Sequence, residues 1–542
     1  MRKIIQSYFN TWQLLFLGIF LSLIFPIGYI LGHLAEPSSE SWHHIVDHLL
    51  ADYALNSFLL VIAVSLLSFL FGVPAAWFVS TCNFPLRKQF EWALMMPLAI
   101  PSYIIAFTYA DMCSYTGSIQ KFYGMLTGGQ SLPFDIMNMP GVALMMASVL
   151  FPYTYIISRT SFLTQSQSLI EASRLMGKSN FSTFIKIVLP LARPAIFGSL
   201  FLIMMEVLNE YGAMKFYGVS TFTTGIFRAW FSLGDPNAAI RLAACLLLFV
   251  LAIILLEKWQ RGQASFTENS KSARPLQRIP LKGAANALAF FSCFIPLAIG
   301  FLIPVAQLIV WVTQTATQVI DAQFWIFVWN SVKVASLAAI VVVVVAIILT
   351  YAVRLNATRW MRYLSKVAVL GYAIPGAVIA VGILASFIGF DQLLNDWAEA
   401  YFNTSFGLIF SSSLPALVFA YLIRFLAVAF NPIESGFEKV ASHLDEASRS
   451  LGASPLKTLF NINIPILKTT LLSAAIMVFV EVMKELPLTL ILRPFNFDTL
   501  ATKAYEMASD ELIREAANAS LIIILIGMIP VIMLVRLMGK ST

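Results

Sequence analysis

The sequence EASRLMGKSNFSTFIKIVLP at residues 171–190 returns as EASRSLGASPLKTLFNINIP at residues 446–465. Nine of the twenty positions are identical, across an ungapped offset of 275 residues. Five more exchange one apolar residue for another, so each copy keeps the same apolar face. Both copies are polar segments in a very apolar chain. We therefore expect this repeated pattern to contact a partner outside the bilayer.

Composition indicates a membrane protein. Of the 542 residues, 59% are hydrophobic and 12% are charged, whereas a soluble domain carries about 25% charged residues. The net charge of +7 is typical of the Lys and Arg excess that membrane proteins place in cytoplasmic loops, so no nucleic-acid partner is expected. The four cysteines have no CxxC spacing and predict neither a disulfide framework nor a metal knuckle.

Twelve apolar runs are long enough to cross a bilayer as helices. The first run follows Arg2 and Lys3 but has no small-x-small cleavage site, so we interpret it as a spanning helix and not as a signal peptide. The runs are 13–33, 55–80, 90–110, 139–158, 192–212, 238–257, 286–312, 328–353, 364–388, 406–428, 466–486 and 516–537. The predicted fold class is an all-α polytopic membrane protein.

Lys and Arg are distributed unevenly among the connections. The connections 34–54 and 389–405 have none, while the middle linker 258–285 has six. Because cytoplasmic connections are enriched in these residues, both termini, the linker and both copies of the pattern are predicted to be cytoplasmic. The fifth connection of each half carries a few cations and fits the alternation least well.

The repetition covers the whole chain. Pro101 returns as Pro375 at an offset of 274 residues. The predicted parts are a first transmembrane half at 1–257, a cytoplasmic linker at 258–285 and a second transmembrane half at 286–542. Six spans in each half make the halves parallel repeats. Other matched pairs are Asn56 with Asn330, Ser57 with Ser331, and Asp235 with Asp510.

Each copy of the pattern is predicted to fold as a helix, a tight turn and a second helix. Gly177 and Gly452 suit the left-handed position that ends a helix. Ser179 and Ser454 suit the cap of the next helix, and Pro455 suits its first position.

The second helix of each copy is predicted to bury one face and to end at a proline, Pro190 or Pro465. Its face has the helical spacing i, i+3, i+4, i+7. The residues are Phe181, Phe184, Ile185 and Val188 in the first copy, and Leu456, Leu459, Phe460 and the polar exception Asn463 in the second.

This pattern resembles the EAA loop of binding-protein-dependent ABC importer permeases, which reads Glu-Ala-Ala, three residues, Gly and an apolar-rich stretch ending near Leu-Pro. Here the third alanine is serine in both copies. The resemblance implies a type I importer permease fold with 12 transmembrane helices in two parallel six-helix pseudo-repeats. It also implies that each loop docks on one of two ABC ATPase subunits. The residues it assigns to ATPase coupling are Glu171, Ala172, Gly177, Pro190, Glu446, Ala447, Gly452 and Pro465.

The residues Gly177-Lys178-Ser179 look like the end of a nucleotide-binding P-loop. A P-loop needs a second glycine where this chain has Ala172, and no buried strand precedes it. We therefore expect ATP to bind to a separate ATPase polypeptide. No cofactor and no catalytic residue are expected in this chain, which is interpreted as a permease and not an enzyme.

Within that family, three stretches are most similar to ferric-iron permeases: PLAIPSYIIA at 97–106, NEYG at 209–212 and TFTTGIFRAW at 221–230. The resemblance implies import of ferric iron from a periplasmic binding protein across a bacterial inner membrane. A permease for thiamine or another small solute is the alternative, because thiamine permeases share the fused layout. An ion-coupled secondary transporter, from a different class, also uses parallel repeats and buried carboxylates but has no reason to carry EAA loops.

Two pairs of carboxylates lie near the ends of apolar runs, one helical turn apart in each pair. Ionisable residues in a spanning helix are costly and usually face a bundle interior or a water-filled cavity. Carboxylate oxygens also suit a hard cation such as Fe³⁺. We predict that they line the translocation pathway; the alternative is a structural network with Lys484, Lys215 or Arg493. The four residues are Glu206, Glu210, Glu481 and Glu485.

Four histidines lie in or beside the first outer connection. His44 and His48 have the i, i+4 spacing of a helical metal pair, but the cluster is absent from the second half. Imidazole suits Zn or Cu better than ferric iron. We interpret the segment as a solvated helix, with a metal site as the alternative. The histidines are His33, His43, His44 and His48.

Overall fold

A computed structural model describes residues 11–164, 173, 176–177, 180–261, 278–356, 358–411 and 413–539. These residues are helical apart from their connections and one pair of two-residue strands. They include 11 helices that are long and apolar enough to cross a membrane, and one bent helix pair brings the number to 12. The prediction of an all-α protein with twelve spans is confirmed.

The long helical segments follow the expected order. They are α2 (Thr11–His33), α4 (Leu50–Thr81), α8 (Met139–Thr164), α11 (Leu189–Asn209), α14 (Pro236–Arg261), α15 (Ala284–Leu297), α16 (Ile303–Val319), α17 (Ala322–Leu355), α19 (Gly376–Phe402), α20 (Leu414–Lys439), α23 (Ile464–Lys484) and α26 (Ile513–Gly539).

Shorter elements connect or extend them. They are α3 (Glu40–His48), β1 (Cys82–Asn83), α5 (Arg87–Ala93), η1 (Met96–Ala99), α6 (Ser102–Cys113), α7 (Ser118–Thr127), α10 (Asn180–Thr183), η2 (Phe184–Val188), α12 (Gly212–Phe216), α13 (Phe222–Phe227), η3 (Arg228–Ser232), β2 (Ile279–Pro280), η4 (Ala298–Leu302), α18 (Arg359–Ala368), η5 (Val369–Ala373), α21 (Ser442–Ser450), α22 (Pro455–Thr458), η6 (Leu459–Asn463), α24 (Pro487–Leu492) and α25 (Leu500–Ser509).

The third span of each half is broken before a proline. Ile100 and Ile374 are extended, with ψ of 116° and 128°, because the residue before a proline is pushed out of the helical region. In the first half the two parts, Arg87–Ala99 and Ser102–Thr127, are bent by 91°. In the second half the apolar run expected at 364–388 is divided in the same way, and its span begins at Gly376.

The chain forms two compact units, and each unit combines residues of both sequence halves. Unit 1 comprises Met1–Ile45, Ile226–Leu247 and Asp321–Lys503; unit 2 comprises Val46–Gly225, Leu248–Ile320 and Ala504–Thr542.

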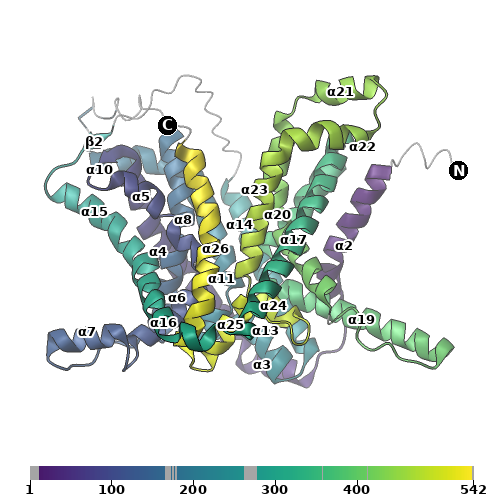
Figure 1. The fold of residues 1–542 in the computed structure, drawn as a ribbon, viewed down its shortest axis with the longest axis horizontal. Helices are drawn as coiled ribbons and strands as arrows, with labels where there is room; N and C mark the ends of the chain where they lie inside the picture. The colour runs from purple at the N-terminus through teal and green to yellow at the C-terminus, as the bar shows by residue number, and fades with distance from the viewer. Residues whose placement is uncertain are drawn as a thin grey trace. The chain divides into compact units, whose positions relative to one another are not determined.

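In unit 1, the first helix that the structure describes packs among helices of the second half. Helix α2 contacts α17, α18 and α19. A Cβ at Gly382 would lie 2.9 Å from the Pro26 carbonyl oxygen, so α19 needs this glycine to approach α2. Helices α17, α20 and α23 pack side by side, and α21 and α22 lie beyond their ends, opposite α24 (Figure 1).

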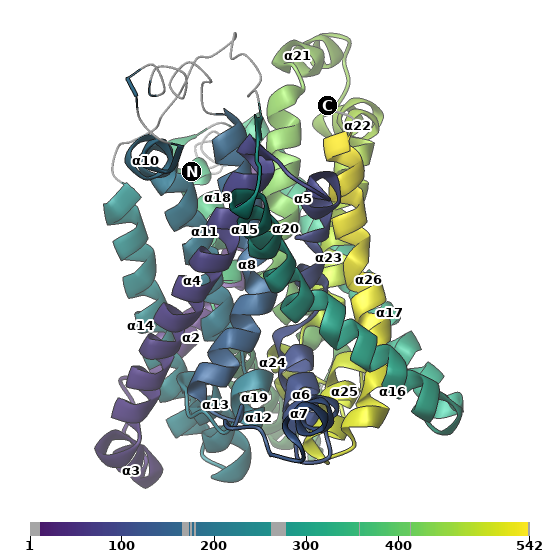
Figure 2. The ribbon, with the colours of Figure 1, turned by 90° about the vertical axis from the view of Figure 1, so that its left-hand side faces the viewer.

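Unit 2 has the matching exchange. Helices α4, α8 and α11 pack together, and α10 lies at the end of this group opposite α6 and α7 (Figure 2). Helix α15, from the second half, contacts α4, and η4 contacts α8. A Cβ at Gly300 would lie 2.0 Å from the Ser148 carbonyl oxygen, so only glycine fits there.

A short parallel strand pair fastens the described end of the linker to unit 2. Strand β2 pairs with β1, with Cys82 opposite Ile279 and Asn83 opposite Pro280. The backbone N–H of Leu281 also donates to the Asn83 carbonyl, at 3.2 Å. The linker therefore leads into α15 from a fixed point at the end of α4.

Candidate functional site: the two repeated loops

The second loop, residues 446–465, has the local structure that its sequence predicts. Helix α21 ends at Ser450, and two residues later comes Gly452, whose φ of +82° is left-handed. Its backbone N–H donates to the Arg449 carbonyl at 3.0 Å. The Ser454 hydroxyl then caps α22 by accepting from the Lys457 N–H at 3.3 Å, and Pro455 takes the first helical position.

The first loop, residues 171–190, is described in part. Gly177 has a φ of +75°, the same left-handed conformation as Gly452. The other predicted residues Glu171, Ala172 and Ser179 lie outside the described residues. The turn that the two glycines were predicted to form is thus confirmed in both loops.

The prediction that Pro190 and Pro465 end the second helix of each loop is wrong. The helices continue to Asn209 and Lys484. The five-residue π turn η2 comes directly before Leu189-Pro190, and the five-residue π turn η6 comes directly before Ile464-Pro465. Because the π turn already breaks the regular i to i−4 bonding, the missing proline N–H and the ring are accommodated without a helix end. Each loop therefore runs directly into a membrane span.

A pair of hydroxyl groups closes each loop internally. Ser173 Oγ lies 2.8 Å from Thr183 Oγ1, and Ser448 Oγ lies 2.9 Å from Thr458 Oγ1. All four side chains are buried. The sequence signal was present, since serine replaces the third alanine in both copies and the threonine is identical, but its meaning was missed.

Polar side chains anchor the second loop to the rest of unit 1. Arg354, at the end of α17, contacts Asp445 with Nε to Oδ2 at 2.6 Å. Asn463 donates to the other Asp445 oxygen at 3.0 Å, which explains a polar residue on the predicted apolar face. The Tyr351 hydroxyl donates to the Pro455 carbonyl at 2.7 Å.

In unit 2, aromatic side chains contact the first loop in place of the polar anchors of the second loop. Trp77 is the counterpart of Tyr351, and its ring centroid lies 4.8 Å from that of Phe184 and 5.9 Å from that of Phe162. Val188 replaces Asn463 and is buried. The two loops thus share a backbone turn but are held by different chemistry.

The second helix of each loop presents apolar side chains outward as well as inward. Leu459 and Asn463 are buried, whereas Leu456 and Phe460 are exposed, so the prediction of one buried face is wrong in part. The residues just before the two left-handed glycines are still more exposed: Met176 at 68% and Leu451 at 89%. Exposed apolar side chains on a polar loop are typical of a protein contact surface.

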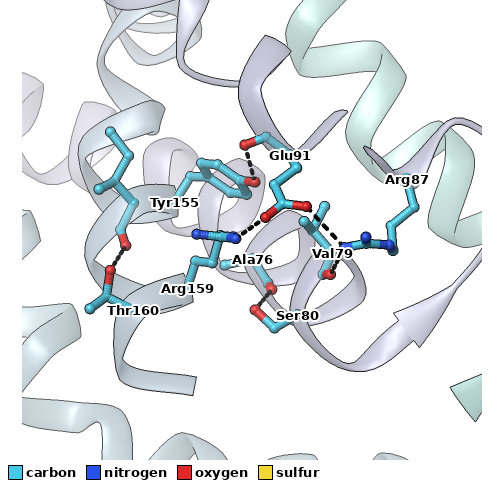
Figure 3. Close-up of polar contacts among 9 residues, drawn as sticks. Ala76, Val79, Ser80, Arg87, Glu91, Tyr155, Arg159 and Thr160 are labelled. Carbon is cyan, nitrogen blue, oxygen red and sulfur yellow. Dashed lines mark hydrogen bonds and ion pairs between the residues drawn. The ribbon is translucent and has the colours of Figure 1, made fainter. Parts of the chain in front are cut away.

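An ion-pair network fixes the helix that leads into the first loop (Figure 3). The Glu91 carboxylate accepts from Arg87 at 3.1 Å and forms an ion pair with Arg159 of α8. The Tyr155 hydroxyl donates to the Glu91 carbonyl at 3.0 Å. Burial and the neighbouring Arg87 guanidinium lower the pKa of Arg278, at the described end of the linker.

The second half has an ion pair at the same place with reversed charges. Glu434 of α20 is the counterpart of Arg159, and it pairs with Lys366 of α18. In both halves, therefore, the short helix after the second span is tied to the helix that leads into the loop. The sequence analysis missed both pairs because their members lie 68 residues apart.

The predicted pathway carboxylates divide into two kinds. Glu210 accepts from the Ala213 N–H at 2.9 Å, and Glu485 accepts from the Leu488 N–H at 3.3 Å. Each of these two therefore caps the short helix that follows it, α12 or α24. Glu206 and Glu481, one turn earlier, are half-buried.

Ion pairs account for the charges of the second carboxylate pair. Glu481 pairs with Lys484 at 2.9 Å, as the alternative prediction proposed. Glu485 pairs with Arg424 at 3.4 Å, and both side chains are almost fully buried. Arg493 pairs with Asp498. Glu206 and Glu210 lie in unit 2, and Glu481 and Glu485 lie in unit 1.

The histidine segment is an exposed helix. His43, His44 and His48 are exposed on α3. His43 is hydrogen-bonded to Ser38 at 2.9 Å, and His33 contacts Glu36 at 2.9 Å. In the part of the chain that the structure describes, no group of three or more His, Cys, Asp or Glu side chains could hold a metal ion.

Comparison with known proteins agrees with this arrangement. A family described as "Binding-protein-dependent transport system inner membrane component" matches residues 68–264 and again residues 343–541. The chain is 26% identical to the Fe(3+)-transport system permease protein FbpB 2 of Haemophilus influenzae, over 96% of this chain and 97% of the relative. It is 25% identical to the ferric transport system permease protein FbpB of Actinobacillus pleuropneumoniae, over 83% of this chain and 65% of that relative.

A shorter similarity reaches a different transport system. The sulfate transport system permease protein CysT of Escherichia coli is 25% identical over 40% of this chain and 76% of its own length. The resemblance that the two loops indicated is thereby confirmed at the level of the family, and it covers both halves of the sequence.

Proposed function

Because the chain belongs to the family of binding-protein-dependent transport system inner membrane components, we propose that it is the permease subunit of an ABC importer that carries ferric iron into the cytoplasm. The observation that carries the proposal is the duplicated loop. In each copy a left-handed glycine follows an exposed apolar residue, Met176 or Leu451, and the second helix of the loop continues without a break into a membrane span. A family of this kind implies an ATPase and a binding protein as partners.

Two ATPase subunits would each take one loop. The connections that carry both loops are rich in Lys and Arg, which supports a cytoplasmic position for the loops and for both termini. The exposed apolar side chains of each loop would then enter the ATPase surface. The ATPase subunits would bind and hydrolyse ATP, so the permease itself would need no cofactor.

The loop geometry supports transmission by rigid contact. Movement of a docked loop would reach the membrane through the continuous segments Phe184–Asn209 and Pro455–Lys484. The π turn and proline at the start of each segment form the joint, and the Ser–Thr pair keeps the two short helices of the loop together. Alternating access would follow from the opposite movement of the two loops' spans.

Ferric iron is supported by a relative that aligns with nearly the whole chain. The FbpB 2 relative is named for Fe(3+) transport and aligns over 96% of this chain, whereas the sulfate relative covers 40%. Glu206 and Glu481 are the candidates for lining the pathway inside the spans, while Glu210 and Glu485 each accept a hydrogen bond from the short helix that follows. Carboxylate oxygens suit a hard cation.

Reconstitution tests the mechanism. The permease, its ATPase and its binding protein would be placed in liposomes, and ATP-dependent uptake of radiolabelled iron would be measured. A Cβ at a left-handed residue costs about 1 kcal/mol or more. Substituting alanine for both Gly177 and Gly452 should therefore abolish ATPase association and uptake but leave membrane insertion intact. Gly389→Ala is the control, since its Cβ would meet only the Tyr29 hydroxyl at 3.8 Å.

Uptake and ATPase association that survived both glycine substitutions would overturn the coupling role of the loops. Uptake driven by an ion gradient without ATP would favour a secondary transporter. Thiamine or sulfate uptake without iron uptake would keep the ABC mechanism and replace the substrate. Glu206→Gln combined with Glu481→Gln should lower iron uptake; unchanged uptake would contradict the pathway role.

A further inference from the structure

Tyr211 and Tyr505 form a buried pair of phenols in unit 2. Their ring centroids lie 5.8 Å apart, and each side chain is 8% exposed. A hydrogen bond joins the two hydroxyl groups. Tyr211 lies between α11 and α12 in the first sequence half, and Tyr505 lies in α25 of the second half. The fold thus brings together two phenols that the sequence keeps far apart.

Other oxygen groups surround this pair. The Ser509 hydroxyl is hydrogen-bonded to Tyr505. Glu210 precedes Tyr211, and its carboxylate is near enough to add to the effect of burial, which raises the pKa of Tyr505. Glu210 Oε1 caps α12 through the Ala213 N–H, which fixes the position of the carboxylate beside the phenols.

Two other tyrosines of unit 2 have ordinary structural contacts. The Tyr109 hydroxyl donates to the Ile299 carbonyl at 2.8 Å, and the Tyr217 hydroxyl donates to the Ala106 carbonyl at 3.1 Å. In the second half, Leu486 is at the position that matches Tyr211. In the first half, Trp230 is at the position that matches Tyr505. The phenol pair is therefore not required by the repeated architecture, and it occurs at only one of the two matched places.

We propose that Tyr211 and Tyr505, with the Glu210 carboxylate, coordinate ferric ion during its passage through the permease. This inference rests on the proposed function as an iron importer. Phenolate and carboxylate oxygens are hard anionic donors, the class that a hard cation prefers.

Coordination at this site is a proton exchange and not a redox step. Each phenol that binds replaces its O–H bond by an O–Fe(III) bond and releases one proton, and the iron stays ferric. When the ion moves on, each phenolate takes a proton back and the hydrogen bond between Tyr211 and Tyr505 forms again.

The test is an optical titration of the assembled transporter in nanodiscs with ferric citrate. Iron(III) bound by phenolate gives a visible charge-transfer absorption that carboxylate or citrate alone does not give. The titration would be done without nucleotide and again with the ATPase trapped by orthovanadate. Tyr211→Phe and Tyr505→Phe should each weaken the ferric ion affinity on the order of tenfold to a hundredfold. Tyr217→Phe, a phenol outside the pair, should leave the absorption unchanged.

Transport gives the second readout. Each of the two pair variants should slow ATP-dependent iron uptake, while stimulation of the ATPase by the binding protein is retained. If the wild type shows no charge-transfer absorption in either state, or if both pair variants keep it, the inference is overturned. If the transporter moves another solute and no iron, the proposed substrate fails instead. Normal iron uptake by both phenylalanine variants would overturn the transit site alone.

Discussion

Ser448 Oγ and Thr458 Oγ1 lie 2.9 Å apart inside the second loop, and Ser173 and Thr183 repeat the contact at 2.8 Å in the first. Thr458 Oγ1 also donates to the Ser454 carbonyl at 3.2 Å, so Ser448 is the donor to Thr458. The pair joins the helix before the glycine turn to the helix after it. It makes each loop one body that a docked ATPase can move.

Ser448→Ala should loosen this body without unfolding the protein. Loss of one hydrogen bond costs about 1 kcal/mol, which corresponds to roughly fivefold faster hydrogen exchange at the loop amides. Ser450→Ala is the matched control, because the Ser450 hydroxyl bonds to the Glu446 carbonyl at the exposed surface. Mass-spectrometric hydrogen exchange of the purified permease measures both. Equal exchange rates in the two variants would argue against a closing role for Ser448.

The second prediction concerns the anchor of the second loop. Asp445 receives hydrogen bonds from Arg354 at 2.6 Å and Asn463 at 3.0 Å, and the Arg354 and Asp445 side chains are mostly buried. Removing one member of a buried ion pair costs about 3 kcal/mol. Asp445→Ala should therefore release the second loop from α17, so that ATP hydrolysis continues but iron uptake falls.

The first loop offers an internal control. Val188 and Trp77 occupy the places of Asn463 and Tyr351 there, and the sequence has Ile170 at the place of Asp445, so substitution of Asp445 removes a carboxylate that only the second loop has. Disulfide cross-linking between each loop and the ATPase should be weakened by Asp445→Ala at the second loop only. Equal loss of cross-linking at both loops would point to general unfolding and contradict a local anchor.

Local chemistry made the turns of the two loops predictable. Gly452 and Ser454 form hydrogen bonds with residues less than four positions away, so the local sequence is enough to predict the turn. Ile100 and Ile374 also break their spans because of the proline that follows each, a local signal that the predicted unbroken runs 90–110 and 364–388 did not take into account. The division into twelve spans needed only the length of the apolar runs.

The remaining features depend on tertiary contacts. Pro465 stays inside a helix because the π turn at Leu459–Asn463 relieves it, and a π turn leaves no pattern in the sequence. Arg424 and Glu485 meet from segments 61 residues apart, and the pairing of Tyr211 with Tyr505 joins the two sequence halves. The sequence also does not show that α2 packs with helices of the second half, because α2 is apolar whichever helices it contacts.

The third prediction compares ion pairs at matched places in the two halves. Glu91 holds the two buried guanidiniums of Arg87 and Arg159, whereas Lys366, which pairs with Glu434, is 58% exposed. Glu91→Gln should lower the free energy of unfolding by about 3 kcal/mol, since it leaves buried charges without their partner. Lys366→Ala should cost about 1 kcal/mol or less, because solvent screens the pair.

Thermal unfolding of the two purified variants, with the permease in the same detergent, measures the difference. The Glu91 variant should melt at a clearly lower temperature than the Lys366 variant. If the two variants lost equal stability, burial would not determine the strength of these contacts, and the network of Figure 3 would have no special role in holding α5 to α8.

The fourth prediction separates a structural carboxylate from a pathway carboxylate. Glu485 is 6% exposed and pairs with Arg424, whereas Glu481 is 29% exposed and pairs with Lys484. Glu485→Gln should destabilise the permease by about 3 kcal/mol and lower its yield in the membrane, because Arg424 stays buried and charged. Glu481→Gln should cost about 1 kcal/mol or less and act mainly on uptake.

A rescue distinguishes the two effects. Replacing a buried ion pair by apolar residues of similar volume is often neutral, so Arg424→Met combined with Glu485→Met should recover much of the stability that Glu485→Gln loses. No compensating change at Lys484 should restore uptake to Glu481→Gln, because the role proposed for Glu481 is contact with the substrate. Measurements of membrane yield, melting temperature and ATP-dependent iron uptake on the same set of variants test both statements. Full uptake by Glu481→Gln, or failure of the double methionine variant to fold better than Glu485→Gln, would contradict them.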